Sequence, residues 1–186
     1  MLPVICSMSV SLDGFIAAPD GDIDWGAPEA ELFDFHVEQT RHLAGYLCGR
    51  RLYETMLVWE TAEQTMSDAA QLEFARIWRR IPKVVFSRTL TSVVGNARLA
   101  TGDLATEVGR LRDQPGEGVV SIGGANLAAA AVAEDLIDEY RQFVNPVVLG
   151  GGTPYFPPLA NRLDLRLIES RTVGSRVVYL RHQRIR

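Results

Sequence analysis

The sequence predicts an α/β fold of three layers, in which a mostly parallel central sheet has helices on both faces and ends in an antiparallel hairpin. Over the first two thirds of the chain, short apolar runs alternate with segments of helical periodicity. Such alternation builds a parallel sheet covered by helices. The last third holds two long strand-like runs joined at Gly174, which indicates a hairpin. With 186 residues, the chain suits one domain, 1–186.

The elements of the first half are separated by turn residues. Leu2–Ser9 is apolar and is expected to form a buried strand. Residues 10–27 hold Asp13-Gly14 and Pro19-Asp20-Gly21 and are expected to form a loop. A helix is expected over Pro28–Leu43, ending at Gly45. Further on we expect a strand at Tyr46–Cys48, helices at Leu52–Leu57 and Leu72–Ile81, and a strand at Lys83–Phe86, where Pro82 stops the second helix.

The elements of the second half follow the same logic. Asp103 has the side chain of an N-cap, and a helix is expected from it to Arg112. The pair Gly123-Gly124 separates an expected strand, Val119–Ile122, from an expected helix, Ala125–Glu134. We also expect a short strand at Ala97–Ala100, a strand pattern over Ile137–Leu149 interrupted at Pro146, and the hairpin strands Leu163–Val173 and Ser175–His182.

Composition and charge narrow the classes of function. The net charge of −4 argues against a nucleic-acid or anionic-membrane partner. The N-terminus lacks the features of a signal peptide, and no segment is long and apolar enough to span a membrane, so a cytoplasmic location is expected. Cys6 and Cys48 lie in apolar runs and are expected to be buried free thiols. The three histidines, His36, His42 and His182, lack metal-ligand spacing, so no metal site is expected.

Three segments follow directly after predicted strands: Gly49–Arg51, Ser87–Thr89 and Gly123–Asn126. If the strands are parallel, these segments meet at one edge of the sheet, where ligands of such sheets bind. Glycine lets an anion approach the backbone at a helix N-terminus, and arginine matches phosphate geometry. The segments together predict a polyphosphate site.

Each signal has a plainer alternative when taken alone. Gly123-Gly124 fits neither the dinucleotide fingerprint nor the P-loop, and it can be a simple strand-to-helix turn. Glu29, Glu31 and Asp34 crowd the start of the first helix, where acidic residues pair with the helix dipole. The sharper hypothesis is that one of these acids reaches a pocket and protonates a substrate. No nucleophile motif or paired-carboxylate spacing is present.

Several short segments, taken in order along the chain, point to a known family. They begin with SVSLDGFIA (Ser9–Ala17) and DGDIDW (Asp20–Trp25). They continue with GRRLYETM (Gly49–Met56), VFSRTL (Val85–Leu90), VSIGGANL (Val120–Leu127) and LIDEYRQFVNPVVLGGGTPYF (Leu136–Phe156). In this order they resemble the dihydrofolate reductase superfamily, and most closely the reductase domain of the riboflavin-biosynthesis deaminase-reductase and its stand-alone relatives.

The resemblance implies an eight-stranded sheet and a bound NADPH. Arg50 would grip the 2′-phosphate, with Ser87 and Arg88 beside it, and Cys6, Ser7 and Ile16 would line the nicotinamide slot. The cofactor residues expected in full are Ser7, Ile16, Gly49, Arg50, Arg51, Ser87, Arg88, Ile122, Gly123, Gly124, Ala125, Asn126 and Leu127. The candidate acids are Glu31 and Asp34, and the expected substrate pocket comprises Met8, Trp25, Phe35, Tyr53, Met56 and Gln142.

Two departures from the superfamily pattern bear on the substrate. Leu52 stands where a threonine is usual, and no arginine stands at the place that clamps folate, where this chain has Ile81. The chain is therefore expected to be an NADPH-dependent reductase of a small C=N or C=O substrate, in the manner of 5-amino-6-(5-phosphoribosylamino)uracil reductase. A nucleotide-binding module without turnover and a true dihydrofolate reductase are the alternatives. A homodimer is expected through the C-terminal strands and Pro154–Pro157.

Overall fold

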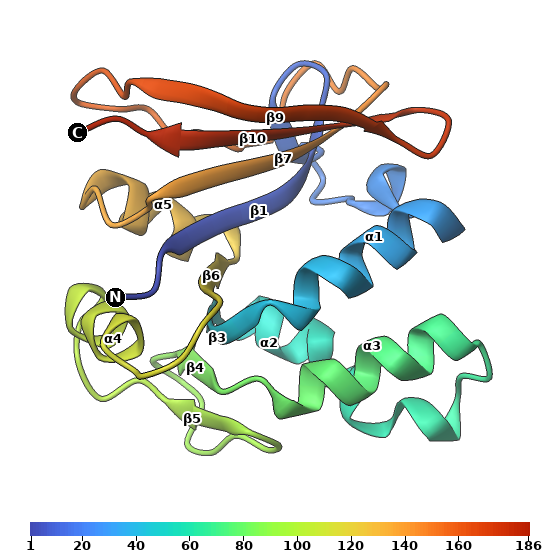
Figure 1. The fold of residues 1–186 in the computed structure, drawn as a ribbon, viewed down its shortest axis with the longest axis vertical. Helices are drawn as coiled ribbons and strands as arrows, with labels where there is room; N and C mark the ends of the chain where they lie inside the picture. Colours follow the sequence, from blue (N-terminus) through green and yellow to red (C-terminus); the bar gives the residue numbers. More distant parts are fainter.

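The computed structural model describes residues 1–186 and has an eight-stranded sheet at its centre, as expected (Figure 1). Six strands pair in parallel, and the last two are antiparallel at one edge. From edge to edge the strands are β5 (Ala97–Leu99), β4 (Lys83–Phe86), β3 (Leu43–Gly49), β6 (Val119–Gly123), β1 (Val4–Ser11), β7 (Glu139–Asn145), β10 (Val177–Arg184) and β9 (Leu165–Val173).

Helices cover both faces of the sheet, which confirms the three layers (Figure 1). One face carries α1 (Ala30–Arg41), α2 (Arg50–Met56), the 3-10 helix η2 (Leu57–Gln64) and α3 (Ala69–Arg80). The other face carries α4 (Leu104–Arg112) and α5 (Ala125–Ala133), which pack on the largest hydrophobic core. A short 3-10 helix, η1 (Asp24–Gly26), and a small two-stranded sheet of β2 (Phe15–Ala17) and β8 (Thr153–Pro154) complete the fold. No helix combines the length and the apolar character needed to cross a bilayer.

Local sequence signals explain several element boundaries. The Asp103 carboxylate accepts a hydrogen bond from the Thr106 amide at 2.9 Å, so the predicted N-cap of α4 is confirmed. The hairpin prediction is also confirmed, because β9 and β10 meet at Gly174, whose φ is +62°. The strand β7 ends at Asn145, directly before Pro146, which has no amide hydrogen to donate to a ladder.

Two predictions of local structure were wrong. Gly45 does not end the first helix: α1 stops at Arg41 and Gly45 pairs with Val120 within β3. A β-carbon there would lie 3.3 Å from the Leu111 side chain, so glycine allows α4 to pack closely on the strand. Residues 10–27 are not all loop, because β1 continues to Ser11 and β2 pairs with β8.

The strand alternation decides which side chains reach which layer. Val4 and Cys6 of β1 point to the α4/α5 face, where they join the main core. Ile5 and Ser7 therefore point to the α1/α3 face. On that face the parallel register places Ser121 beside Ile5 and Arg141 beside Ser7.

Candidate functional site

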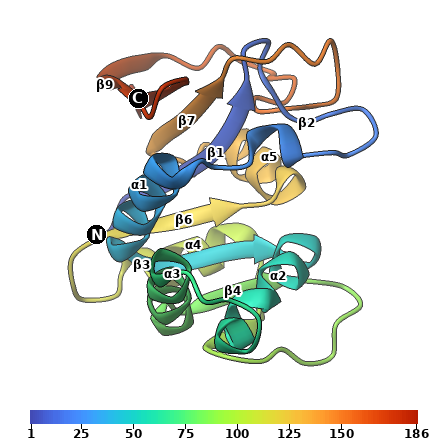
Figure 2. The same ribbon diagram turned by 90° about the vertical axis from the view of Figure 1, so that its right-hand side faces the viewer.

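The carboxyl ends of β3, β4 and β6 open into a cleft with a volume of about 580 Å³. In Figure 2 the arrows of β3 and β6 point to the side of the molecule where α2 begins. The three segments that follow these strands thus meet, as the sequence predicts. The cleft is lined by Gly49, Arg50, Arg51, Leu52, Phe86, Ser87, Arg88, Thr89, Gly124, Ala125, Asn126, Leu127 and Thr153.

The N-terminus of α5 forms one wall of this cleft. Its N-cap is Gly124, whose φ of +91° is a conformation that favours glycine. No side chain caps the helix, so its first backbone N–H groups and the positive end of its dipole are available to a ligand. The glycine pair is therefore a turn that also presents an anion-binding helix end.

Arginines give the cleft its positive charge. Arg51 and Arg88 are exposed and make no ion pair, and the Nη1 atom of Arg50 lies 3.4 Å from the Glu54 carboxylate. Ser87 fixes the turn that carries Arg88, because its hydroxyl accepts hydrogen bonds from the amides of Thr89 and Leu90 at 3.1 and 2.9 Å. A phosphate in this cleft would meet several donors and no unpaired acid.

A second cavity of about 280 Å³ lies on the α1/α3 face of the sheet. Its walls are largely aromatic, and α1, η2 and α3 each contribute at least one ring. Phe74 packs against Trp59 and Trp78 with ring centroids 4.6 and 6.2 Å apart. The lining residues are Ile5, Ser7, Pro28, Phe33, His36, Gln39, Thr40, Leu43, Tyr46, Met56, Trp59, Phe74, Trp78, Ser121 and Arg141.

The floor of the aromatic cavity is polar. Arg141 is buried, and its Nε donates to Glu139 and its Nη1 to the Gln39 side-chain oxygen, each at 2.5 Å. Glu139 also pairs with Arg181 at 2.7 Å. His36 faces the cavity from α1, and burial lowers its pKa to about 4, so its imidazole is neutral at physiological pH.

One thin wall separates the cleft from the aromatic cavity. Leu52 lines the cleft and Tyr46 lines the cavity. A β-carbon at Gly123 would overlap the Tyr46 hydroxyl and would lie 2.6 Å from Leu52. Glycine at this position therefore lets the Tyr46 and Leu52 side chains approach each other.

Most of the expected cofactor residues are brought together in the cleft. Four are not among its lining residues. Gly123 lies under the dividing wall, and Ile122 is fully buried in the main core. Ser7 lines the aromatic cavity, and Ile16 lies half-buried in β2 against the main core.

The two candidate acids line neither the cleft nor the aromatic cavity. Glu31 and Asp34 are exposed on α1. At about 100° per residue, the helix turns Phe33, His36 and Thr40 toward the cavity instead. Glu31 borders a shallow surface depression beside Arg171.

Of the expected substrate-pocket residues, Met56 lines the aromatic cavity and the other five do not. Gln142 follows Arg141 on β7, so it points to the opposite face, and Met8 packs on the main core. The remaining three are occupied elsewhere: Phe35 packs against Tyr179 at 5.1 Å, the Tyr53 hydroxyl bonds the Val94 amide at 2.7 Å, and the Trp25 indole donates to the Asp22 carbonyl at 3.1 Å.

The sequence reasoning missed His36, Gln39, Arg141 and Trp78. The available signal for Arg141 was its place within the strand pattern predicted over Ile137–Leu149, since arginine is rarely buried unless it is paired. The helical spacing of His36 and Thr40 was also visible, but nothing in the sequence shows which face of a helix covers a cavity.

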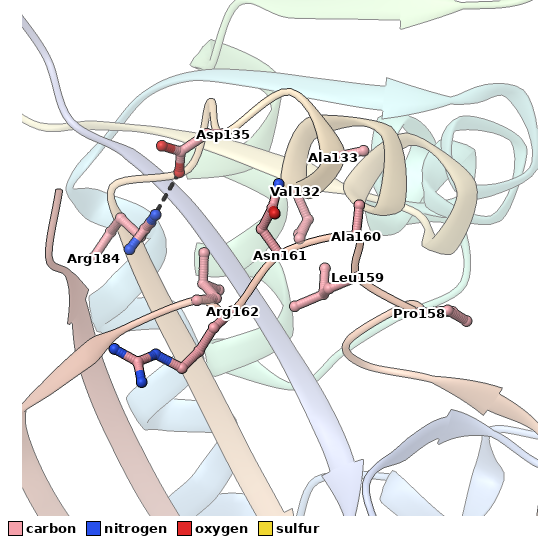
Figure 3. A pocket seen from close by; sticks show the side chains of 10 residues that line it. Val132, Ala133, Asp135, Pro158, Leu159, Ala160, Asn161, Arg162 and Arg184 are labelled. Atoms are coloured by element: carbon pink, nitrogen blue, oxygen red, sulfur yellow. Dashed lines mark hydrogen bonds and ion pairs between the residues drawn. The ribbon is translucent and has the colours of Figure 1, made fainter.

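A third cavity of about 340 Å³ lies away from these two, near the end of α5 (Figure 3). Arg184 crosses its floor to pair with Asp135 at 2.9 Å, and Arg162 points outward. Residues 158–163 form its rim. None of the expected site residues lines it.

Comparisons with known proteins agree with this geometry. Residues 3–179 match the family described as RibD C-terminal domain. The chain is 29% identical over 180 residues to the uncharacterized protein YyaP of Bacillus subtilis, covering 95% of this chain and 92% of YyaP. It is 33% identical over 175 residues to YwjB of the same organism, covering 91% of each.

Solved structures share the fold. A putative riboflavin biosynthesis protein from Shewanella sp. PV-4 aligns over the whole of both chains with 26% identity and a TM-score of 0.78. A Thermotoga maritima deaminase/5-amino-6-(5-phosphoribosylamino)uracil reductase aligns over 99% of this chain and 57% of its own, with 13% identity and a TM-score of 0.68. An Enterococcus faecalis dihydrofolate reductase complexed with NADP(H) aligns over 99% and 97%, with 12% identity and a TM-score of 0.63.

Proposed function

The chain belongs to the RibD C-terminal domain family, and on that premise we propose that it is an NADPH-dependent reductase of a small molecule with a C=N or C=O bond. The family and fold are those of reductases of the riboflavin-pathway type. The cofactor occupies the arginine-lined cleft, and the substrate occupies the aromatic cavity.

The observation that carries the proposal is the presence of two different cavities whose linings include the neighbouring side chains Tyr46 and Leu52. The cleft has an uncapped helix N-terminus and three arginines, which suit a pyrophosphate and a further phosphate. The aromatic cavity suits a flat organic ring. Because Tyr46 and Leu52 meet above Gly123, ligands in the two cavities approach each other there.

The protein's contribution is positioning. Arg50 and Arg88 hold the phosphates, and Gly124 with the first turn of α5 holds the pyrophosphate. NADPH supplies the hydride when it is bound. The aromatic side chains Trp59 and Trp78 exclude water and hold the acceptor ring. No carboxylate lines the aromatic cavity, so the proton that completes the reduction comes from water.

NADPH titration followed by a turnover assay tests this function. We expect saturable NADPH binding and NADPH oxidation with at least one pyrimidine, pterin or dicarbonyl compound. Binding without oxidation across that panel would favour the nucleotide-binding module. Rapid turnover of dihydrofolate would favour a true dihydrofolate reductase. Failure to bind NADPH at high micromolar concentration would overturn the proposal.

We also propose a homodimer through the C-terminal strands, which are one of the two contacts that the sequence predicts. Within the Pro154–Pro157 stretch Tyr155 is buried and not available to a partner, although Pro154 is exposed. The edge strand β9 instead exposes Leu167 and Ile168, which are 54% and 44% accessible. Light scattering that gives the mass of a single chain would contradict the proposed homodimer.

A further inference from the structure

The two cavities differ sharply in charge, and this difference bears on the substrate. The cleft is lined by three arginines that are exposed. Among the 15 residues that line the aromatic cavity, Arg141 is the only lysine or arginine. A doubly charged phosphate therefore has its partners in the cleft and lacks them in the cavity.

Nearby cations are already engaged and do not change this contrast. The Lys83 amine donates to the carbonyl oxygens of Trp78 and Ile81 at 2.7 and 3.1 Å, and it lies 3.8 Å from Glu60. Arg41 pairs with Glu73 at 3.1 Å. Lys83 is thus bound within the protein, and the charge of Arg41 is offset by the carboxylates of Glu73 and Glu38.

The helix that covers the cavity adds negative charge. Pro28 lines the cavity just before α1, and the exposed residues Glu29, Glu31 and Asp34 follow it. A phosphate or carboxylate entering past this helix would meet like charge. The cavity and its approach thus favour an uncharged ligand.

One nitrogen of Arg141, Nη2, makes no hydrogen bond within the protein. Its Nε is bound to Glu139 and its Nη1 to Gln39, while Nη2 has no acceptor in the protein. The buried polar side-chain atoms without a partner belong to Tyr140, Arg181 and His182, so Nη2 of Arg141 is accessible from the cavity. Nη2 of Arg141 can therefore donate to a carbonyl oxygen of a ligand.

We propose that the aromatic cavity takes an uncharged, flat, unphosphorylated ring, and that Arg141 Nη2 donates a hydrogen bond to a carbonyl oxygen of that ring. This inference rests on the proposed function, since it names the substrate class of the same reductase. The half-buried rings of Phe33 and Trp59 contact the faces of the ligand ring, and Ser7 and Ser121 contact its polar edge. A positive donor at the carbonyl oxygen also stabilises the negative charge that hydride addition places there.

Paired ligands that differ by one charged group test the substrate class. The pairs are lumazine and 6-carboxylumazine, 1,4-naphthoquinone and its 2-sulfonate, and uridine and uridine 5′-phosphate. Binding is followed by quenching of tryptophan fluorescence in the full-length protein, because two of its three tryptophans, Trp59 and Trp78, line the cavity. We expect the neutral member to bind at least about tenfold more tightly, the effect of one unfavourable charge. Tighter binding of a charged member, or no binding of any neutral member at millimolar concentration, overturns the proposal.

Two variants test the role of Arg141. Arg141→Lys keeps the charge next to Glu139 but removes Nη2, so we expect neutral-ring affinity and kcat/KM to fall about tenfold or more. Arg166→Lys, on the exposed strand β9, is the matched control and should bind and turn over normally. An Arg141→Lys protein with unchanged ring affinity overturns the inference. NADPH affinity and thermal stability are measured on both variants, so failure of the proposed function or of folding is distinguished from failure of the substrate class.

Discussion

At the scale of the residue, Arg50 shows how a single side chain can set cofactor choice. It lies in the cleft with one weak partner, Glu54, and is free to bind the phosphate that distinguishes NADPH from NADH. We expect Arg50→Ala to weaken NADPH binding roughly 10- to 100-fold, the value of a charged hydrogen bond, and to leave NADH binding within about twofold. Fluorescence titration of the variant with NADPH and with NADH measures both affinities.

Arg51→Ala is the control for this prediction, because Arg51 is the adjacent arginine of the same cleft. A smaller selectivity change in that variant would identify Arg50 as the phosphate reader. Equal losses for NADPH and NADH in Arg50→Ala would contradict the assignment.

Glu107 is a second residue whose environment has a measurable consequence. Its buried carboxylate accepts hydrogen bonds from Arg98 and from the amides of Thr101 and Gly102. The Arg98 hydrogen bond lowers the pKa of Glu107 from 4.5 to about 2. Such a group stabilises the fold above its unfolded pKa, and that stabilisation is lost as the pH falls through about 2.

We therefore expect Glu107→Gln to lower the free energy of unfolding by about 3 kcal/mol at neutral pH, from the size of the pKa shift. The difference from the wild type should shrink as the pH falls below 4.5 toward 2. Urea unfolding across this range checks both statements. Glu38→Gln, at an exposed position of α1, should have little effect. A constant difference at every pH would show that Glu107 acts through shape and not through charge.

At the scale of the element, the small sheet of β2 and β8 shows why loops flanking the cleft keep their shape. Asp13 ties the two loops together by accepting the amides of Leu149 and Gly150 at 3.1 and 2.7 Å. Gly152, with φ of +125°, lies so close to β2 that a β-carbon would overlap the Ala17 carbonyl oxygen. The glycine-rich segment is therefore needed for close approach of two backbones.

Gly152→Ala should separate β2 from β8 and lower the free energy of unfolding by about 2 kcal/mol, the cost of a strained backbone position. Gly151→Ala is the matched control, because its β-carbon would meet only Pro19 at 3.7 Å and its φ is not positive. Thermal unfolding of both variants gives the comparison. Equal stability of the two proteins would contradict the role given to Gly152.

The elements also show what the sequence can predict. The strand over Lys83–Phe86 was predicted with the ends that β4 has in the structure. A short apolar, β-branched run bounded by Pro82 and Ser87 indicates a buried strand. The short strands β2 and β8 escaped prediction, because their pairing joins Phe15 to Pro154 across the whole chain. The cleft was predictable from residues that follow strands. The aromatic cavity was not, because it depends on how α1 and α3 are rotated over the sheet.

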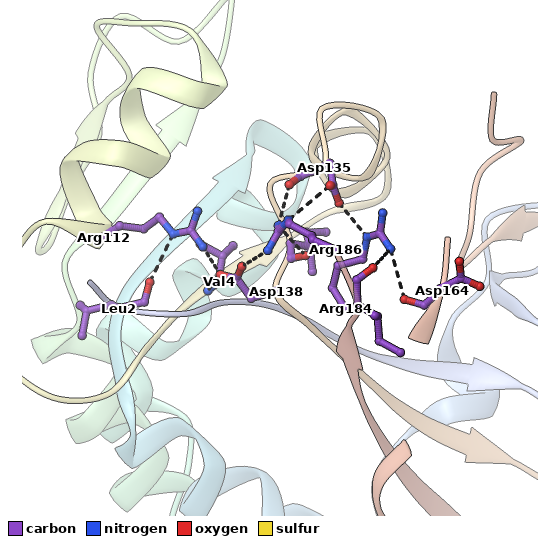
Figure 4. Close-up of polar contacts among 10 residues, drawn as sticks. Leu2, Val4, Arg112, Asp135, Asp138, Asp164, Arg184 and Arg186 are labelled. Atoms are coloured by element: carbon purple, nitrogen blue, oxygen red, sulfur yellow. Dashed lines mark hydrogen bonds and ion pairs between the residues drawn. The ribbon is translucent and has the colours of Figure 1, made fainter. Parts of the chain in front are cut away.

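At the scale of the whole molecule, ion pairs and hydrogen bonds of charged side chains hold the first strand and the C-terminus together (Figure 4). Asp138 accepts the Val4 amide at 2.8 Å and Arg186 Nη1 at 2.7 Å, and it also pairs with Arg112. Burial opposes ionisation of Asp138, but these donors hold its pKa below the usual range. The first strand, α4 and the C-terminus thus share one carboxylate.

Asp138→Asn should lower the free energy of unfolding by about 2 kcal/mol, because charged hydrogen bonds are lost at a half-buried site. NADPH affinity should stay unchanged, since the contacts of Asp138 lie far from the residues of the cleft. Asp164→Asn is the control, because its exposed pair with Arg162 contributes little. Loss of NADPH affinity in Asp138→Asn would show that the two ends of the sheet are coupled.

The two buried thiols make the protein suited to site-selective chemical labelling. Cys6 lies in the main core on the α4/α5 face and Cys48 packs with Tyr53 and Val85 on the other face, and burial raises the pKa of each thiol to about 12. Both should therefore resist maleimides while the protein is folded. A cysteine introduced at Thr89, on the rim of the cleft, would then carry the dye alone. The rate at which the native thiols are slowly labelled would in turn measure the rate at which the sheet opens.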